Sequence, residues 1–215
     1  MRQEVIKEKI AQGCLVKMEE IRFILKYVYG LLAKTEEVWT RLSDPECKEG
    51  RNDYMMRYYY WPLMGVGCLL IFLLHGNGVM LHTKMTAFEA SFSLEYAMKG
   101  MASFALGYAA GPILAGIIIK ELYGRATNEQ LDKNQLEIFV HYSMSIVMIF
   151  EMFCACLPYF TFLSFIGLYV IYIVYLGTST YLKVQVSRGL FVTIAFLAIY
   201  FSPSALQFLL ELFEK

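Results

Sequence analysis

Long apolar stretches almost free of charge constrain the fold of this chain more than any other feature. They cover residues 58–74, 100–119, 138–157, 159–182 and 189–213. The only acids inside them are Glu151 and Glu211. A bilayer has a hydrocarbon core about 30 Å thick, which about 20 apolar helical residues can cross. We therefore predict an all-α, polytopic integral membrane protein with five transmembrane helices.

The overall composition agrees with a membrane protein and excludes several other classes. Of the 215 residues, 58% are hydrophobic and only 18% are charged, whereas about a quarter of a typical soluble domain is charged. The 19 basic residues are balanced by 19 acidic ones, so no basic excess indicates nucleic-acid binding. Abundant aromatic residues exclude a disordered chain, and five scattered cysteines do not form a disulfide framework.

The basic residues are unevenly distributed, which predicts the orientation. Eleven of the 19 Lys and Arg residues precede residue 58. With the N-terminus inside, only Lys84, Lys99 and Lys215 lie outside. Because basic loops stay on the cytoplasmic side during insertion, we predict a cytoplasmic N-terminus and an external C-terminus. Residues 1–57 are then a cytoplasmic segment, and residues 58–215 form the five-span bundle. The charged start MRQEVIKEKIAQG also lacks the pattern of a cleaved secretory leader.

The segment before the first span is predicted to be helical and amphipathic. Its apolar residues recur at three- and four-residue spacing, at Leu15, Met18, Ile21, Leu25, Val28 and Leu32. A second short helix over residues 35–42 carries Trp39, and Thr35 is expected to cap it. We expect this segment to lie on the membrane, with packing on cytoplasmic loops or a second copy as the alternative. The predicted membrane-interface residues are Leu25, Val28, Leu32, Trp39, Tyr60 and Trp61.

Small residues at four-residue intervals mark the second span. They are Ser103, Gly107, Gly111 and Ala115. Such a ladder lets another helix backbone approach closely, which drives helix association in lipid. The partner is either another span of the same chain or a second protomer. Pro112 lies inside the ladder and predicts a kink, because proline removes one backbone hydrogen bond.

Glu151 is the strongest candidate for a functional site. An ionised carboxylate in mid-membrane costs several kcal/mol, and no basic residue inside the spans pairs with it. One interpretation is a proton- or cation-handling site that His141 extends toward the cytoplasm. The other is a neutral acid hydrogen-bonded to a tyrosine hydroxyl or a backbone carbonyl. Tyr169, Tyr172 and Tyr175 either line a groove or satisfy buried polar groups between helices.

Recognisable catalytic and metal-binding patterns are missing from the sequence. There is no G-x-S-x-G, no H-E-x-x-H and no Gly-rich phosphate loop. Cys154 and Cys156 are two residues apart on one predicted helix, so they point in directions about 200° apart and do not chelate a metal together. We therefore predict a non-enzymatic protein with no catalytic residues, no metal and no cofactor.

Two stretches resemble the YIP (Ypt/Rab-interacting protein) family of membrane proteins. The first is LLAKTEEVWTRLSD followed by YMMRYYYWPLMGVGCLLIFL, and the second is IGLYVIYIVYLGTSTYLKVQVSRGLFVTIAF. The resemblance implies five spans with a cytoplasmic N-terminus. Eukaryotic members are trafficking proteins that bind Rab-type GTPases and carry a cytoplasmic Asp-Leu-Tyr-Gly-Pro motif before the spans. That motif is missing here, so Rab binding is not carried over, and the resemblance favours a bacterial member in the cytoplasmic (inner) membrane.

Two functions follow as hypotheses. The first is a membrane-organising or partner-binding scaffold, whose cytoplasmic helices contact the lipid surface or a partner. The second is a small-solute or proton-linked transporter or channel component that uses Glu151, His141 and the helix-breaking prolines. The expected partners are the lipid bilayer and either a membrane-protein partner or a second copy of the chain, with no nucleic acid.

Overall fold

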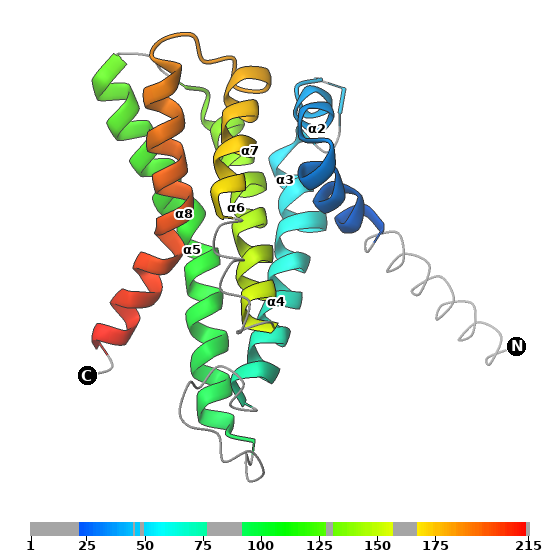
Figure 1. The fold of residues 1–215 in the computed structure, drawn as a ribbon, viewed down its shortest axis with the longest axis vertical. Helices are drawn as coiled ribbons and strands as arrows, with labels where there is room; N and C mark the ends of the chain where they lie inside the picture. The colour runs from blue at the N-terminus through cyan, green and yellow to red at the C-terminus, as the bar shows by residue number, and fades with distance from the viewer. Residues whose placement is uncertain are drawn as a thin grey trace, which may run out of the picture.

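The computed structural model describes residues 22–44, 46–47, 50–76, 92–127, 131–156 and 167–213, and the regular structure in these ranges is entirely helical (Figure 1). Residues 22–33 form a helix, followed by α2 (Thr35–Leu42), α3 (Asn52–Met55), the π-helix η2 (Met56–Tyr60), α4 (Trp61–Gly76), α5 (Leu94–Thr127), α6 (Lys133–Cys156), α7 (Gly167–Thr180) and α8 (Arg188–Phe213). The predicted all-α fold class is therefore confirmed.

Among the residues that the structure describes, four helices are long and apolar enough to cross a membrane. They are Asn52–Gly76, Leu94–Thr127, Lys133–Cys156 and Arg188–Leu210. The described part of α7 has 14 residues, about 21 Å of helix, which is less than the hydrocarbon thickness. The predicted fourth span over residues 159–182 begins outside the described residues. The structure thus supports a membrane-embedded bundle with four long helices, and the fifth span stays a prediction.

Helix α6 lies at the centre of the bundle and contacts α4, α5, α7 and α8. Every residue from 138 to 149 is buried, although the sequence there includes His141, Tyr142, Ser143 and Ser145. Neither water nor lipid reaches the polar side chains of a helix buried on all sides, so their partners must lie within the protein. Ser145 and His141 have such partners, whereas the Ser143 hydroxyl has none among the described residues. The polar residues of α6 therefore determine which side chains the surrounding helices present inward.

The small-residue ladder of α5 packs against α8 of the same chain. A Cβ added to Gly107 would lie 3.2 Å from the carbonyl oxygen of Pro203, and one added to Gly111 would lie 3.4 Å from the Pro203 ring. Ala115 is fully buried, whereas Ser103 is partly exposed. Helices α5 and α8 cross near their middles (Figure 1). At both glycines, the partner of this ladder is thus another helix of the same chain.

Residues 22–42, which we call the N-terminal layer, are fixed to the bundle by Trp39. This side chain has no exposed surface, and its ring lies 5.5 Å from the rings of both Phe139 and Tyr181. Gly177 of α7 provides the space, because a Cβ there would lie 2.8 Å from the Trp39 ring. The ring fills a gap between α6 and α7 and does not face the lipid, so the predicted membrane-interface position of Trp39 stays a prediction about depth alone.

Helix α2 has the predicted bounds but a different start. Its N-cap residue is Lys34, and no side chain caps it. The Thr35 hydroxyl instead donates to the carbonyl oxygen of Leu31 at 2.7 Å. Of the predicted interface residues in the preceding helix, Leu25 is 61% exposed, whereas Val28 and Leu32 are partly buried against the core. The earlier part of the apolar stripe, Leu15, Met18 and Ile21, lies outside the described residues.

We predict that Trp39→Ala lowers the free energy of unfolding by about 3–5 kcal/mol, because it leaves a large cavity in the core. Trp61→Ala is the matched control, since Trp61 is 45% exposed and its loss should cost much less. Reversible unfolding of the full chain in detergent–SDS mixtures measures both. Equal losses for the two tryptophans would contradict the central role of Trp39.

Candidate functional site

Glu151 lies where α5, α6 and α8 meet, and neutral side chains hold its carboxyl group. Tyr108 of α5 donates its hydroxyl to Oε2 of Glu151 at 2.5 Å. Gln207 of α8 donates its amide to Oε1 at 3.2 Å. Glu151 thus joins the three helices through two hydrogen bonds. The contact with Tyr108 is the one that the neutral-acid interpretation predicted, a tyrosine hydroxyl on the carboxyl group.

Pro112 explains why the backbone carbonyl of Tyr108 needs a hydrogen-bond donor from another helix. Proline has no N–H, so Pro112 does not donate to the carbonyl oxygen of Tyr108 four residues earlier. Tyr60 donates its hydroxyl to that oxygen at 2.7 Å, and both Tyr60 and Tyr108 are essentially fully buried. A tyrosine from another helix therefore replaces the backbone donor that α5 lacks.

The π-helix η2 directs two adjacent tyrosine side chains toward two different helices. Tyr60 contacts α5, whereas Tyr59 forms a 2.7 Å hydrogen bond with the Ser145 hydroxyl on α6. Single-turn π-helices are rare in proteins overall, and those that do occur are often found at functional sites. The Tyr60 side chain is buried and does not face the lipid, so its predicted membrane-interface position stays a prediction about depth alone. Trp61, the next residue, is half exposed, as an interfacial residue would be.

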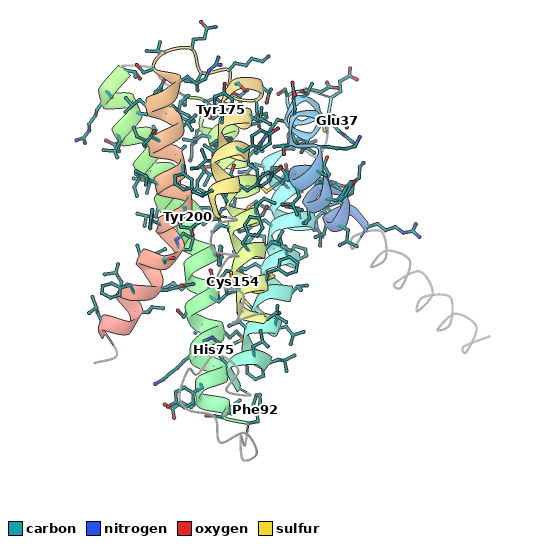
Figure 2. All side chains as sticks on the ribbon, viewed as in Figure 1. Glu37, His75, Phe92, Cys154, Tyr175 and Tyr200 are labelled. Carbon is teal, nitrogen blue, oxygen red and sulfur yellow. The ribbon has the colours of Figure 1, made fainter. Side chains whose placement is uncertain are left out.

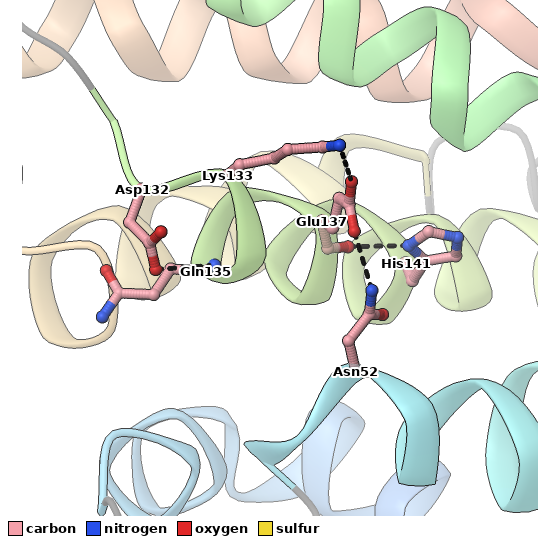
Figure 3. A network of polar contacts seen from close by, with 6 residues as sticks. All are labelled: Asn52, Asp132, Lys133, Gln135, Glu137 and His141. Carbon is pink, nitrogen blue, oxygen red and sulfur yellow. Dashed lines mark hydrogen bonds and ion pairs between the residues drawn. The ribbon is translucent and has the colours of Figure 1, made fainter.

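His141 belongs to a second polar group at the α2 end of α6 (Figure 3). Its Nδ1 lies 2.7 Å from the carbonyl oxygen of Glu137, and its ring meets the Tyr60 ring edge-on with centroids 4.7 Å apart. The Glu137 carboxylate accepts a hydrogen bond from Asn52 at 2.7 Å and lies 3.7 Å from the Lys133 ammonium. His141 and Glu151 are therefore in separate polar groups, and Tyr60 contacts the first through its ring and the Tyr108 carbonyl through its hydroxyl.

The predicted tyrosine series of α7 does not reach Glu151. Tyr169 donates its hydroxyl to the carbonyl oxygen of Leu32 at 2.6 Å and lies 3.2 Å from the Thr35 hydroxyl. It therefore secures the N-terminal layer, as the interpretation of buried polar groups expects. Tyr172 and Tyr175 are about half exposed, and Figure 2 shows Tyr175 near the α2 end of the bundle.

Sequence reasoning missed three residues of the site: Tyr108, Gln207 and Ser202. Ser202 is buried and donates its hydroxyl to the Gly111 carbonyl at 3.1 Å. Two signals were available. The first signal is that Tyr108 lies four positions before Pro112, so its backbone carbonyl lacks the helical donor. The second is that Gln207 carries an amide side chain inside a predicted apolar span.

Three cavities of the structure bear on function. An apolar groove of about 380 Å³ lies between residues 22–33, α4 and α6, where its lining includes Leu25, Val28, Val66, Leu70, Met152 and Phe153. A pocket of about 540 Å³ lies beside α3 and the start of α6. A pocket of about 170 Å³ lies between residues 22–33 and α2. Glu151 lines none of these three cavities.

No protein-family model matches the chain, and neither a curated protein nor a solved structure matches it. Membership of the YIP family thus stays a prediction. Within the described ranges, no group of three His, Cys, Asp or Glu side chains is placed to hold a metal ion. The contacts of the site are hydrogen bonds from neutral donors to the Glu151 carboxyl group and to backbone carbonyls.

We predict that Tyr60→Phe lowers the free energy of unfolding by about 1–2 kcal/mol, because it leaves the Tyr108 carbonyl without its donor. The matched control is Tyr172→Phe, at a half-exposed tyrosine, which should change little. In a Pro112→Ala background the cost of Tyr60→Phe should shrink, since the introduced alanine supplies the missing N–H. A double-mutant cycle in detergent–SDS mixtures measures this coupling, and additive effects would contradict it.

Proposed function

We propose that this chain is a non-enzymatic, membrane-organising scaffold of the YIP type, which rests its N-terminal layer on the cytoplasmic lipid surface of a bacterial inner membrane. The proposed orientation, with the N-terminus inside and the C-terminus outside, follows from the distribution of Lys and Arg. In this arrangement the bundle is an anchor, and the N-terminal layer is the part that acts on the bilayer.

The observation that carries this proposal is a layer fixed to the bundle on one side that exposes an apolar and an aromatic side chain among charged ones on the other. Trp39 and Tyr169 hold the N-terminal layer to α6 and α7, so its position is defined by the bundle. Leu25 and Tyr29 are 61% and 64% exposed on the same helix. An apolar side chain and an aromatic one exposed among charged residues, on a layer that is fixed to a membrane bundle, are suited to contact with the headgroup region.

A nitroxide label at position 25 tests where this layer lies. In a cysteine-free full chain in nanodiscs, a label on Leu25→Cys should be more accessible to oxygen, which concentrates in lipid, than to a water-soluble nickel chelate. The matched label is Glu37→Cys, because the Glu37 side chain is 71% exposed on α2, and we expect it to favour the nickel chelate. Preferential nickel access at position 25 would overturn the proposed contact with lipid.

The second candidate function is a proton-linked transporter component. The observation that favours it is a partly buried carboxyl group inside α6, whose hydrogen-bond partners Tyr108 and Gln207 are both neutral. Both partners donate to Glu151, which is the arrangement of a structural link between helices. Nevertheless, ionisable residues inside membrane spans often mark functional sites. The role of Glu151 in proton transport therefore needs a direct test.

We predict that Glu151→Gln keeps the fold within about 1 kcal/mol, since the glutamine amide can accept from Tyr108 and exchange a hydrogen bond with Gln207. Glu151→Leu should destabilise by more, because both partners then lose their acceptor inside the bundle. Unfolding in SDS measures both variants. Proton uptake into liposomes, followed with a trapped pH dye, completes the test. A wild-type uptake that Glu151→Gln abolishes would favour the transporter over the scaffold.

A further inference from the structure

The groove of about 380 Å³ between residues 22–33, α4 and α6 is lined by aliphatic, aromatic and sulfur-containing side chains. We call it the apolar groove. Its lining includes Leu25, Val28, Val66, Leu70, Met152 and Phe153. Among the described residues that line it, none carries a charged, amide or hydroxyl group. Charge and hydrogen bonds to side chains therefore do not select the occupant of this groove.

The apolar groove follows the axes of two helices. Tyr59, just before α4, bonds to Ser145 of α6. Further along both helices, Gly67 packs against Met152. Helices α4 and α6 therefore run side by side in the same direction (Figure 1), and the groove extends over about 10 Å of each. A groove of this shape suits an extended hydrocarbon chain that lies along the bundle.

Residues 22–33 form the third wall of the groove. Ile24, Leu25 and Val28 of this helix line it. The adjacent face of the same helix is anchored through Tyr27, which is buried and packs its ring against aromatic rings of η2 and α6. The helix does not close onto α4 without the loss of this packing. The apolar groove is therefore a fixed feature of the fold.

The groove opens onto a surface that the bilayer covers. Val66 and Phe153 both line it, and they are 59% and 53% exposed. Each lies in a helix that is long and apolar enough to cross a membrane, so lipid hydrocarbon meets both side chains once the bundle is inserted. The lipid-facing surface of α4 and α6 thus continues without a break into the groove beneath the N-terminal layer.

Hydrocarbon is the occupant that this environment favours. An ordered water needs two to four polar partners, and the described side chains of the groove supply none. An empty groove would deprive its lining of packing contacts on one side, which is costly in a protein interior. The bilayer supplies hydrocarbon at the open side, so a lipid tail fills the space with material already present.

We propose that the apolar groove binds one acyl chain of a phospholipid from the cytoplasmic leaflet. The leaflet follows from the proposed orientation, because the groove lies beside the first part of α4, next to the N-terminal layer. The acyl chain then packs between Val66 and Phe153 of the bundle and Leu25 and Val28 of the layer. This inference rests on the proposed function, because the layer must lie at the lipid surface for a chain to enter beneath it.

The lining predicts recognition of the acyl chain and not of the headgroup. Phosphatidylcholine and phosphatidylglycerol with the same acyl chains should therefore occupy the groove equally, because no polar side chain in its described lining distinguishes them. A clear preference for one headgroup would assign the recognition to groups outside the groove and would overturn the inference.

Photolabelling of the full chain in nanodiscs tests the proposal. A trace of phosphatidylcholine with a diazirine in the middle of one acyl chain is activated by light, and the labelled residues are mapped by mass spectrometry. We expect more label on Val28 and Met152 than on Phe208 and Leu209, which are exposed on α8 at the level where Gln207 contacts Glu151. Equal labelling of groove and α8 would show ordinary lipid contact and overturn the inference.

A variant that fills the groove gives the second arm of the test. Val66→Trp should reduce the label on Val28 and Met152 about fivefold, because the indole takes up the space of the acyl chain. The label on Phe208 should not change. Leu69→Trp is the matched control, since Leu69 is 61% exposed on the same helix but does not line the groove, and it should leave the labelling unaltered.

Equal loss of label in Val66→Trp and Leu69→Trp, or no loss in either, would contradict the proposed site. The pair Val66→Phe and Leu69→Phe repeats the comparison with a smaller change of volume. An unaltered melting temperature shows that each variant is folded.

Three outcomes identify another occupant or a failed premise. If Val66→Cys but not Leu69→Cys forms a disulfide between two copies of an otherwise cysteine-free chain, a second copy covers the groove and the lipid assignment is wrong. If the nitroxide at position 25 is accessible to oxygen but the groove is labelled no more than α8, only the acyl-chain site fails. If that nitroxide prefers the nickel chelate, the premise of surface contact fails, whatever the labelling of the groove.

Discussion

A backbone carbonyl without a donor is the constraint on which the interior of this bundle depends. Pro112 deprives the Tyr108 carbonyl of its helical hydrogen bond, and in hydrocarbon no water replaces it. Tyr60 supplies the donor from the helix that precedes α4. Tyr108 is then held at its backbone by one helix and, through its hydroxyl, to Glu151 of another. One proline inside the continuous helix α5 thus helps to specify how three elements meet.

The same requirement explains why the most buried helix carries so many polar side chains. In α6, the Ser145 hydroxyl pairs with Tyr59, Glu151 accepts from Tyr108 and Gln207, and the ring of His141 is tied to the Glu137 carbonyl. Apolar contact alone gives little specificity between helices in lipid, since the tails are as apolar as leucine. The hydrogen bonds of Ser145 and Glu151 join α6 to other helices and therefore select one rotation of α6 relative to its neighbours, whereas the bond of His141 lies within α6.

Local patterns predicted the helices well and their contacts less well. The apolar runs 58–74, 100–119 and 189–213 lie within long helices, and α2 has the predicted bounds, because length and hydropathy are local properties. Trp39 and Tyr60 were assigned to the membrane interface, since buried aromatic residues and interfacial ones look alike in a sequence. The sequence indicates the type of partner that Glu151 could have, a tyrosine hydroxyl. That this tyrosine is Tyr108 depends on how α5 and α6 are rotated about their axes, which no local pattern encodes.

The π-helix η2 also sets the angle about the helix axis at which α3 stands relative to α4. Successive residues of an α-helix turn by about 100°, so deleting one residue from Met56–Tyr60 would rotate the attached α3 by about that angle relative to α4. Asn52 would then point away from Glu137, which it now contacts at 2.7 Å. The chain length between Asn52 and Trp61 is therefore fixed by geometry, and a change of sequence in η2 is tolerated more readily than a change of length.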